Sequence, residues 1–152
     1  MKHQLNPTQI EVFTTAGKAT ITLQNLKSGK HFTYKVEAPR KRTPMGGYKA
    51  DIKAAVRFVK VLVGQNNEGD FSFIGCLFFQ ADGSWIYRPS KKSDISPEAP
   101  SQKAFNFAWK NKHQLPPSLV IFHEGKCGRC AKPLTVPASI ESGFGPECIT
   151  KV

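Results

Sequence analysis

Alternating apolar and polar side chains mark two strands in the first quarter of the chain. In residues 19–24 and again in residues 31–37, every second side chain is apolar, and a glycine-containing stretch separates the two segments. Period-two alternation is typical of a strand that buries one face. We therefore expect a β-hairpin here, preceded by a loose start over residues 1–8 and by a segment of some strand character at 9–15.

Three further strands are expected in the middle of the chain. Residues 57–63 alternate in the same way, residues 71–79 are apolar on both faces toward their end, and residues 85–88 follow an Asp82-Gly83 turn signal. The stretch 64–70 between the first two predicts a turn. This meander would join the first hairpin in one antiparallel sheet. By contrast, two prolines and a Gly-Gly pair predict an irregular segment at 38–48.

Helical spacing appears at residues 100–112. Phe105, Ala108 and Trp109 recur at i, i+3 and i+4, which predicts a helix packed on the sheet. Ser96 or Ser101 is the expected N-cap. We therefore predict an α+β fold: an antiparallel sheet of about five strands, one main helix and a C-terminal treble-clef-like zinc module. Residues 1–118 would form the sheet region and residues 119–152 the module, within one continuous globular unit.

Three cysteines carry the zinc prediction. Cys127 and Cys130 form a Cys-x-x-Cys pair, and Cys148 follows after seventeen more residues. We expect Gly128 to let the backbone turn tightly enough for both sulfurs to reach one ion. Pro146 predicts a helix start at Cys148, where the positive end of the helix dipole would favour the thiolate. This layout is typical of a treble-clef Zn²⁺ site.

A structural zinc ion takes four ligands, so one more is needed. His123 follows the apolar run at 119–122 and is the expected fourth ligand, with Cys76 and His113 as alternatives. The competing interpretations of the cysteines are reduced thiols without a metal, a redox pair and a disulfide. A redox pair is disfavoured because no parallel α/β pattern surrounds it, and a disulfide because no secretory signal is recognisable.

The cysteine segment also resembles a known family. It contains Cys127-Gly-Arg-Cys130, Pro133-Leu-Thr, Pro137-x-Ser-Ile140 and Gly143-x-Gly-Pro-x-Cys148. These motifs are similar to an uncharacterised zinc-ribbon-like family of short phage and mobile-element proteins, which is also appended to helicase-like ATPases. The Phe-Thr-Tyr strand, Ser90-Lys-Lys-Ser93 and Ser96-Pro-x-Ala-Pro-Ser101 extend the resemblance upstream to about residue 19. The resemblance implies a zinc site and a phage or mobile-element origin.

The positive net charge of the chain favours a negatively charged partner. The chain has 152 residues and a formal net charge of +11, and residues 27–60 hold ten basic side chains against two acidic ones. Such a field attracts nucleic acid, an anionic membrane or an acidic protein, although a merely solvated surface is the alternative. No apolar run long enough to span a membrane and no signal peptide is recognisable. We therefore expect a cytoplasmic location in a bacterial host cell, with no membrane partner.

These features predict a zinc-stabilised nucleic-acid-binding protein of phage or mobile-element origin. The alternative is a phage-encoded inhibitor or adaptor that binds a host protein complex, such as an anti-phage defence complex. An enzyme is not expected, because His123-Glu124 lacks the spacing of a zinc deaminase and the chain has neither a P-loop nor a nucleophile elbow. Nucleic-acid contacts are predicted for Arg40, Lys41, Arg42, Tyr48, Lys49, Lys53, Arg57 and Arg129.

Overall fold

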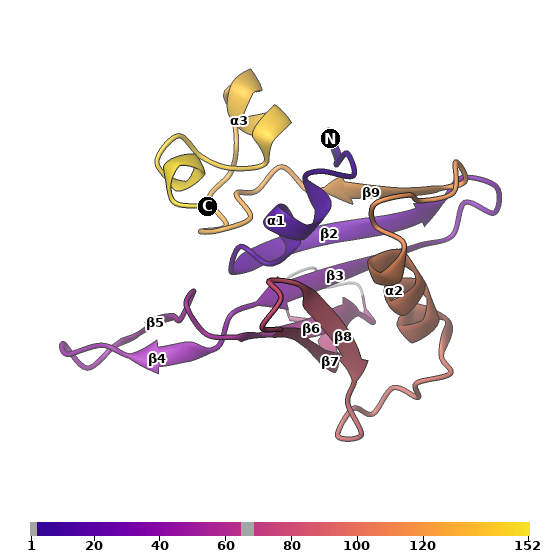
Figure 1. Ribbon diagram of the computed structural model, residues 1–152, viewed down its shortest axis with the longest axis horizontal. Coiled ribbons are helices and arrows are strands. Elements are labelled where there is room, and N and C mark those ends of the chain that lie inside the picture. Colours follow the sequence, from indigo (N-terminus) through magenta and orange to yellow (C-terminus); the bar gives the residue numbers. More distant parts are fainter. Residues whose placement is uncertain (1–2, 65–68) are drawn as a thin grey trace.

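Antiparallel strands are the main regular structure of the protein, as the computed structural model shows for residues 3–64 and 69–152 (Figure 1). Seven strands form one sheet in the order β1-β9-β2-β3-β6-β7-β8, and β4 and β5 pair separately as a hairpin. The strands are β1 (His3–Gln4), β2 (Lys18–Asn25), β3 (His31–Glu37), β4 (Arg40–Arg42), β5 (Tyr48–Ala50), β6 (Val56–Leu62), β7 (Phe71–Phe79), β8 (Trp85–Pro89) and β9 (Leu119–His123).

The helices of the described residues are short. They are α1 (Ile10–Thr14), α2 (Pro100–Lys110), α3 (Pro137–Ser142) and the single 3-10 turn η1 (Cys148–Thr150). The predicted α+β class with about five strands is therefore wrong, because the protein is mostly β and its main sheet has seven strands. The difference arises mainly at the sheet edge: β9 pairs with β2 on one side and with β1 on the other. Neither pairing leaves a local signal in the sequence.

The predicted hairpin and meander are present. β2 and β3 pair in register, with Ile21 opposite Tyr34, and β6, β7 and β8 follow one another as antiparallel neighbours. Of the turn predicted at 64–70, residues 65–68 lie outside the described residues. The segment with some strand character at 9–15 contains α1 instead, because Ile10 and Phe13 lie three residues apart and are both buried.

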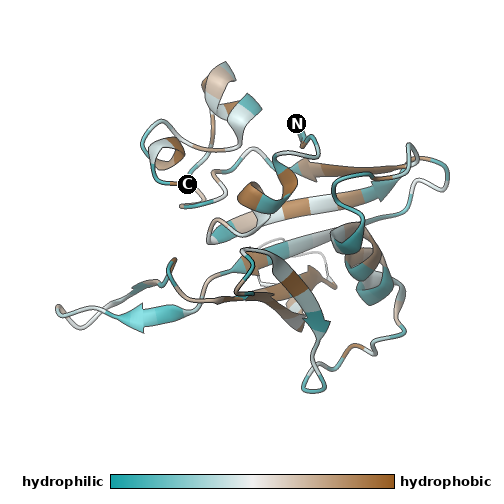
Figure 2. Ribbon diagram, in the orientation of Figure 1, coloured by the Kyte–Doolittle hydropathy of each residue, from teal (hydrophilic) through white to brown (hydrophobic). Residues whose placement is uncertain are grey.

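One face of the sheet carries the core. Tyr34, Val36, Val59 and Val61 are buried on this face, and Tyr34 lies 5.0 Å from Phe105 of α2 between ring centroids. Helices α1 and α2 both lie on this side in Figure 1, and Figure 2 shows hydrophobic residues along the strands beneath them. Burial of such large apolar side chains is the main stabilising contribution to the fold.

Helix α2 buries the three residues that its spacing predicted. Phe105, Ala108 and Trp109 are all in the core. The predicted serine cap is wrong, because Ala99 is the N-cap and no side chain caps the helix. Pro100 in the first turn lowers the need for a cap, since it has no N–H to satisfy.

A second substructure projects from the sheet. β4, β5 and the turn between them form a hairpin, here called the arm (residues 40–50), which extends to the left in Figure 1. The expectation of an irregular segment at 38–48 is thus wrong. Pro39 precedes β4 and Pro44 lies in the turn, so neither proline interrupts the ladder. Gly46 supplies the left-handed conformation of the turn, with φ of 89°.

None of the described helices is long and apolar enough to cross a lipid bilayer.

Candidate metal centre and basic arm

The three predicted thiols lie together. The Sγ atoms of Cys127, Cys130 and Cys148 are all within 4.8 Å of one another. Four sulfurs at about 2.3 Å from a tetrahedral zinc ion would be roughly 3.8 Å apart, so an ion can enter with only a small adjustment. The group could therefore hold a metal ion, and it draws on two segments separated by seventeen residues.

Backbone hydrogen bonds shape the loop that carries Cys127 and Cys130. The N–H of Cys127 donates to the Lys132 carbonyl at 2.8 Å, and the N–H of Ala131 donates to the Cys127 carbonyl at 2.8 Å. Ala131 takes the left-handed conformation, with φ of 66°. The turn therefore does not use Gly128 in the way the sequence suggested. Gly128 is needed for space, because a Cβ there would lie 2.8 Å from the Phe13 ring.

Cys148 begins a single 3-10 turn of three residues, not a helix. The predicted treble-clef layout is therefore incomplete, and so short a turn has no substantial dipole to offer the thiolate. A hydrogen bond from the Ile149 N–H to the Gly145 carbonyl, at 3.0 Å, fixes the entry to this turn. The position of Cys148 thus depends on the Gly145-Pro146 bend rather than on helix formation.

The thiols differ in their electrostatic surroundings. Burial disfavours the Cys127 thiolate, but backbone N–H groups of Gly145, Cys130 and Arg129 outweigh burial and lower the pKa of Cys127. Burial raises the pKa of Cys148, and the Arg129 guanidinium, with Nη1 at 3.8 Å from Sγ, only partly offsets it. Cys127 is therefore better prepared than Cys148 to give up its proton to a metal.

His123 lies apart from this group. It is 1% exposed, its Nε2 lies 2.7 Å from the Ile140 carbonyl, and its Nδ1 accepts the Gly125 N–H at 3.0 Å. Because Nδ1 accepts, the proton belongs on Nε2, which then donates to Ile140. Both ring nitrogens are thus engaged, so in this geometry His123 links β9 to α3 instead of facing an ion.

The two alternative fourth ligands are also elsewhere. Cys76 lies on β7 of the main sheet, where burial raises the pKa of its thiol, and His113 is exposed just after α2. Neither belongs to the group of close ligand atoms, which among the described residues consists of the three cysteines. Of the predicted metal ligands, the fold therefore brings together the three cysteines alone.

Phe13 joins the cysteine loop to the sheet. Its side chain is fully buried and lies 5.4 Å from the His123 ring and 5.7 Å from the Phe144 ring, between centroids. A Cβ on Gly128 or on Gly143 would clash with the Phe13 ring. Sequence analysis missed this residue; the two glycines, Gly128 between Cys127 and Cys130 and Gly143 before Cys148, were the available signal.

The arm brings most of the predicted nucleic-acid residues together. Arg40, Lys41, Arg42, Tyr48 and Lys49 all lie on its two strands and are exposed. The Tyr48 side chain is 66% exposed, although it is aromatic. Opposite positions place Arg42 beside Tyr48 on one face and Lys41 beside Lys49 on the other. Lys53, also exposed, follows the arm in the chain.

Arg57 does not belong to this surface. It is 2% exposed, and its guanidinium donates to the carbonyl groups of Thr15, Ile52, Ala54 and Val56 at 2.6–2.8 Å. All of these donors are directed inward, so Arg57 cannot contact a phosphate in this conformation. It instead fastens the base of the arm to the end of α1.

Arg129 lies where the cysteine loop meets the base of the arm. A Cβ on Gly17 would touch Ile52, which follows the arm, and would lie 3.7 Å from the Arg129 carbonyl. The next residue, Lys18, donates its N–H to the Gly128 carbonyl at 2.9 Å. The base of the arm and the cysteine loop therefore both approach the segment Gly17-Lys18. A recess of about 420 Å³ beside the thiols is lined by Arg129, Lys132 and Lys151, among others.

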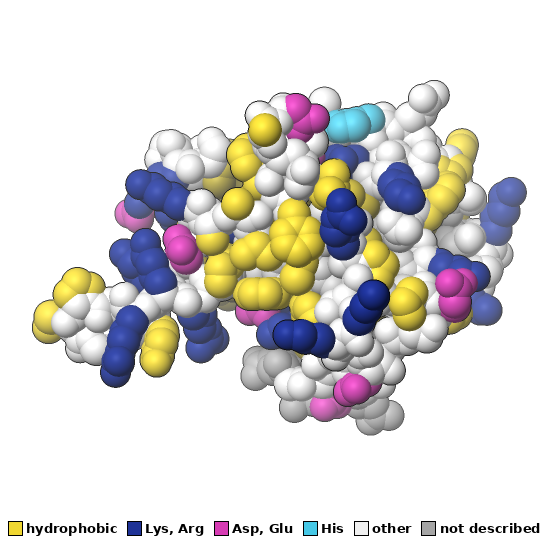
Figure 3. Space-filling model, turned by 60° about the horizontal axis from the view of Figure 1, so that its bottom comes forward, with side chains coloured by type: hydrophobic (Ala, Val, Ile, Leu, Met, Phe, Trp, Pro, Cys, Tyr) yellow, Lys and Arg dark blue, Asp and Glu magenta, His cyan; other side chains and the backbone are white. Residues whose placement is uncertain are grey.

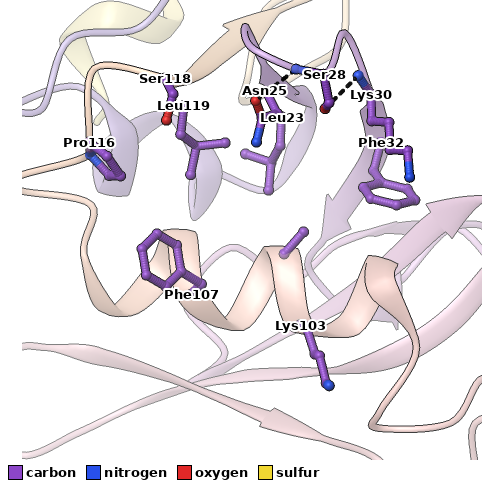
Figure 4. Close-up of a pocket in the computed structure, with 11 residues that line it drawn as sticks. Leu23, Asn25, Ser28, Lys30, Phe32, Lys103, Phe107, Pro116, Ser118 and Leu119 are labelled. Carbon is purple, nitrogen blue, oxygen red and sulfur yellow. Dashed lines mark hydrogen bonds between the residues drawn. The ribbon is translucent and has the colours of Figure 1, made fainter.

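An apolar hollow of about 480 Å³ lies at the other end of the sheet (Figure 4). Leu23, Phe32, Phe107 and Leu119 form much of its wall, from β2, β3, α2 and β9. No histidine, cysteine or carboxylate is among the described residues that line it. The hollow therefore lacks the groups that acid–base or thiol chemistry would need.

A protein-family comparison matches the C-terminal part of the chain. A model of the family described as "Family of unknown function (DUF6011)" matches residues 118–152, a segment that includes all three clustered thiols. No curated protein and no solved structure matches the chain. The match and the thiol group together are consistent with a zinc-ribbon-like module at the C-terminus.

Proposed function

We propose that the protein is a zinc-stabilised nucleic-acid-binding protein. The observation that carries this proposal is the arm, a projecting hairpin with exposed cations on both faces and an exposed tyrosine. In this proposal the zinc ion stabilises the fold, and the arm makes the contacts. The role is binding, not catalysis.

Cys127, Cys130 and Cys148 would hold the Zn²⁺ ion. Thiolate sulfur in a compact group is the donor set that zinc prefers in structural sites. The three thiols leave one tetrahedral position for a further ligand, which another residue or water would supply. Bound zinc would fix the two segments of the C-terminal module (residues 124–152) to each other, next to Phe13 and the base of the arm.

The charge pattern of the arm supports a polyanionic partner. Lys41 and Lys49 are directly opposite each other on neighbouring strands, a position where like charges destabilise the pairing. Lys41 has one nearby carboxylate, Asp51, at 3.7 Å. Phosphate groups would relieve the remaining repulsion, and release of condensed counterions would favour binding.

A direct test is fluorescence anisotropy with labelled single-stranded DNA, double-stranded DNA and RNA across a series of salt concentrations. In the triple variant Arg40→Gln, Lys41→Gln, Arg42→Gln, the slope of log K against log salt should become shallower by about 2 to 3, because three phosphate contacts are lost. The matched control neutralises Lys91, Lys92 and Lys110, which lie outside the arm.

A control variant that reduces the salt slope as much as the arm variant would place the binding surface elsewhere. Absence of binding to every nucleic acid at micromolar protein and low salt would overturn the proposal. An acidic protein partner would then be the better explanation of the charged arm.

A further inference from the structure

The sheet has a second face, opposite the one that α1 and α2 cover. Strand register places Lys35, Phe58, Lys60, Phe73, Phe78 and Arg88 on it, here called the open face. A bulge between Val59 and Lys60 keeps Phe73 on the same side as Phe58, and their rings meet edge to face with centroids 6.1 Å apart. Among the described residues, no helix packs on this side (Figure 1).

Aromatic side chains on the open face reach solvent. Phe78 is 36% exposed, and Phe58 and Phe73 are half-buried. A solvated face of an antiparallel sheet ordinarily carries polar side chains. Figure 3 shows hydrophobic side chains exposed together beside the arm, with Lys and Arg side chains around them. An exposed apolar area with a polar rim is typical of a binding surface.

Cations also lie on the open face. Lys35 and Lys60 are directly opposite each other on β3 and β6, where like charges repel. Neighbouring groups moderate the repulsion. Among them, Glu37 lies 3.1 Å from the Lys60 Nζ, and the Phe71 ring lies 4.5 Å from the Lys35 Nζ. Both lysines therefore place positive charge on the open face, beside its aromatic side chains.

The open face and the arm form one path. β3 ends at Glu37, three residues before β4, and β5 ends at Ala50, six residues before β6. The arm therefore continues the two strands that carry Lys35, Phe58 and Lys60. In Figure 1 it extends away from the ends of these strands. An extended ligand that follows these strands along the open face would therefore lead toward the arm.

We propose that the open face binds single-stranded nucleic acid, with bases stacked on Phe58, Phe73 and Phe78 and phosphates near Lys35, Lys60 and Arg88. This inference rests on the proposed nucleic-acid function and specifies its substrate class. Stacking on aromatic rings requires unpaired bases, because the bases of a duplex are already stacked on one another. The arm, by contrast, can contact the phosphates of both single-stranded and duplex nucleic acid.

Charge favours this occupant over a second copy of the chain. Two copies joined through their open faces would bring Lys35, Lys60 and Arg88 of each into proximity, within a protein of net charge +11. Such a contact is repulsive. A single strand instead offers phosphates to the cations and aromatic bases to the phenylalanines.

The test compares single-stranded and duplex affinity in leucine variants. Phe73→Leu and Phe78→Leu keep an apolar side chain but remove the ring, so each should weaken binding of a 20-nucleotide oligo-dT by about tenfold. Affinity for a 20-base-pair duplex should stay within about twofold. The matched control is Phe107→Leu, because Phe107 is also an exposed ring, 49% exposed, but it lies on α2. Circular dichroism checks that each variant is folded.

The outcomes separate the two proposals. If both leucine variants bind oligo-dT as the wild type does while the arm variant is weakened, the open-face inference fails and the proposed function stands. If no form binds any nucleic acid, both fail. A dimer in sedimentation equilibrium that Phe78→Leu disrupts would assign the face to a second copy and overturn the inference. Photo-crosslinks from 5-iodouracil oligonucleotides to the peptides containing Phe73 or Phe78 would support it.

Discussion

The C-terminal module and the arm both leave the main sheet, but they are built in opposite ways. The module packs against Phe13 through Gly128 and Gly143, and its Cys127 and Cys148 are buried. The arm has no core: the Met45 side chain at its turn is 94% exposed and Tyr48 is 66% exposed. In the module, packing accounts for the residue types at these positions, because they are buried or lie against the Phe13 ring. In the arm, packing does not account for Met45 and Tyr48, because their side chains are exposed. Changes in the module should therefore alter stability, and changes in the arm should alter binding alone.

The largest effect is expected from loss of the metal centre. Cys148→Ser, or a chelator added to the wild type, should abolish binding of one zinc ion per chain and sharply lower the unfolding temperature. Bound zinc contributes on the order of 10 kcal/mol to folding of small modules, so even a fraction of this is large. Metal analysis with differential scanning calorimetry measures both quantities.

Cys76→Ser is the matched control for this experiment. Cys76 lies on β7, outside the thiol group, so this variant should retain its zinc. A Cys148→Ser protein with one bound zinc and an unchanged unfolding temperature would contradict the assignment of the three thiols.

A smaller loss of stability is expected at the contact between the module and α1. Gly128→Ala places a methyl group 2.8 Å from the Phe13 ring, and overpacking of this kind costs about 1–3 kcal/mol. Gly145→Ala is the control, because no atom lies within 4 Å of the added Cβ. Urea unfolding compares the two variants. Equal stabilities would mean that Phe13 can move away without cost.

The parts of the fold that were predictable from sequence are those with a local hydrophobic pattern. The alternation around Tyr34 and Val59 predicted the central strands, and the spacing of Phe105 and Trp109 predicted α2, because each pattern reflects one buried face. The pairing of β9 with β1 and β2 was not predictable, since partner choice between distant strands depends on the whole sheet. The predicted fold class was wrong because these pairings were not recognised.

The candidate site divides in the same way. The spacing of Cys127, Cys130 and Cys148 predicted a group that the structure assembles. The expectation for His123 followed only from its nearness in sequence to Cys127, and the ring is engaged by Ile140, a contact across seventeen residues. The prediction for Arg57 failed for a similar reason. A count of basic residues does not distinguish a buried cation such as Arg57 from an exposed one.

Acid should weaken the module through His123. Burial lowers the pKa of this side chain below its usual value of 6.5, despite the hydrogen bond to Ile140. The unfolded chain therefore binds a proton more readily, so the stabilisation is present above pH 6.5 and is lost as the pH falls toward the folded-state pKa. Urea unfolding at pH 7.5 and pH 5.0 measures the loss.

His123→Gln isolates this contribution, because acid also weakens thiolate–metal binding in both proteins. The free energy of unfolding of the wild type should fall more between the two pH values than that of the variant. An equal fall in both would show that the pKa of His123 is the same in the folded and the unfolded chain, so that the folded protein binds this proton without cost.

The smallest effect on stability, and the sharpest contrast with the module, is expected at Tyr48. Because its ring is 66% exposed, Tyr48→Ala should change the free energy of unfolding by no more than about 0.5 kcal/mol. Affinity for single-stranded oligonucleotides should nevertheless fall by about fivefold, since one stacking surface is lost beside Arg42. Met45→Ala, in the turn of the same arm, removes an exposed apolar side chain without a ring and should leave affinity unchanged. If the two variants weaken binding equally, the contribution of Tyr48 is general apolar contact and not stacking.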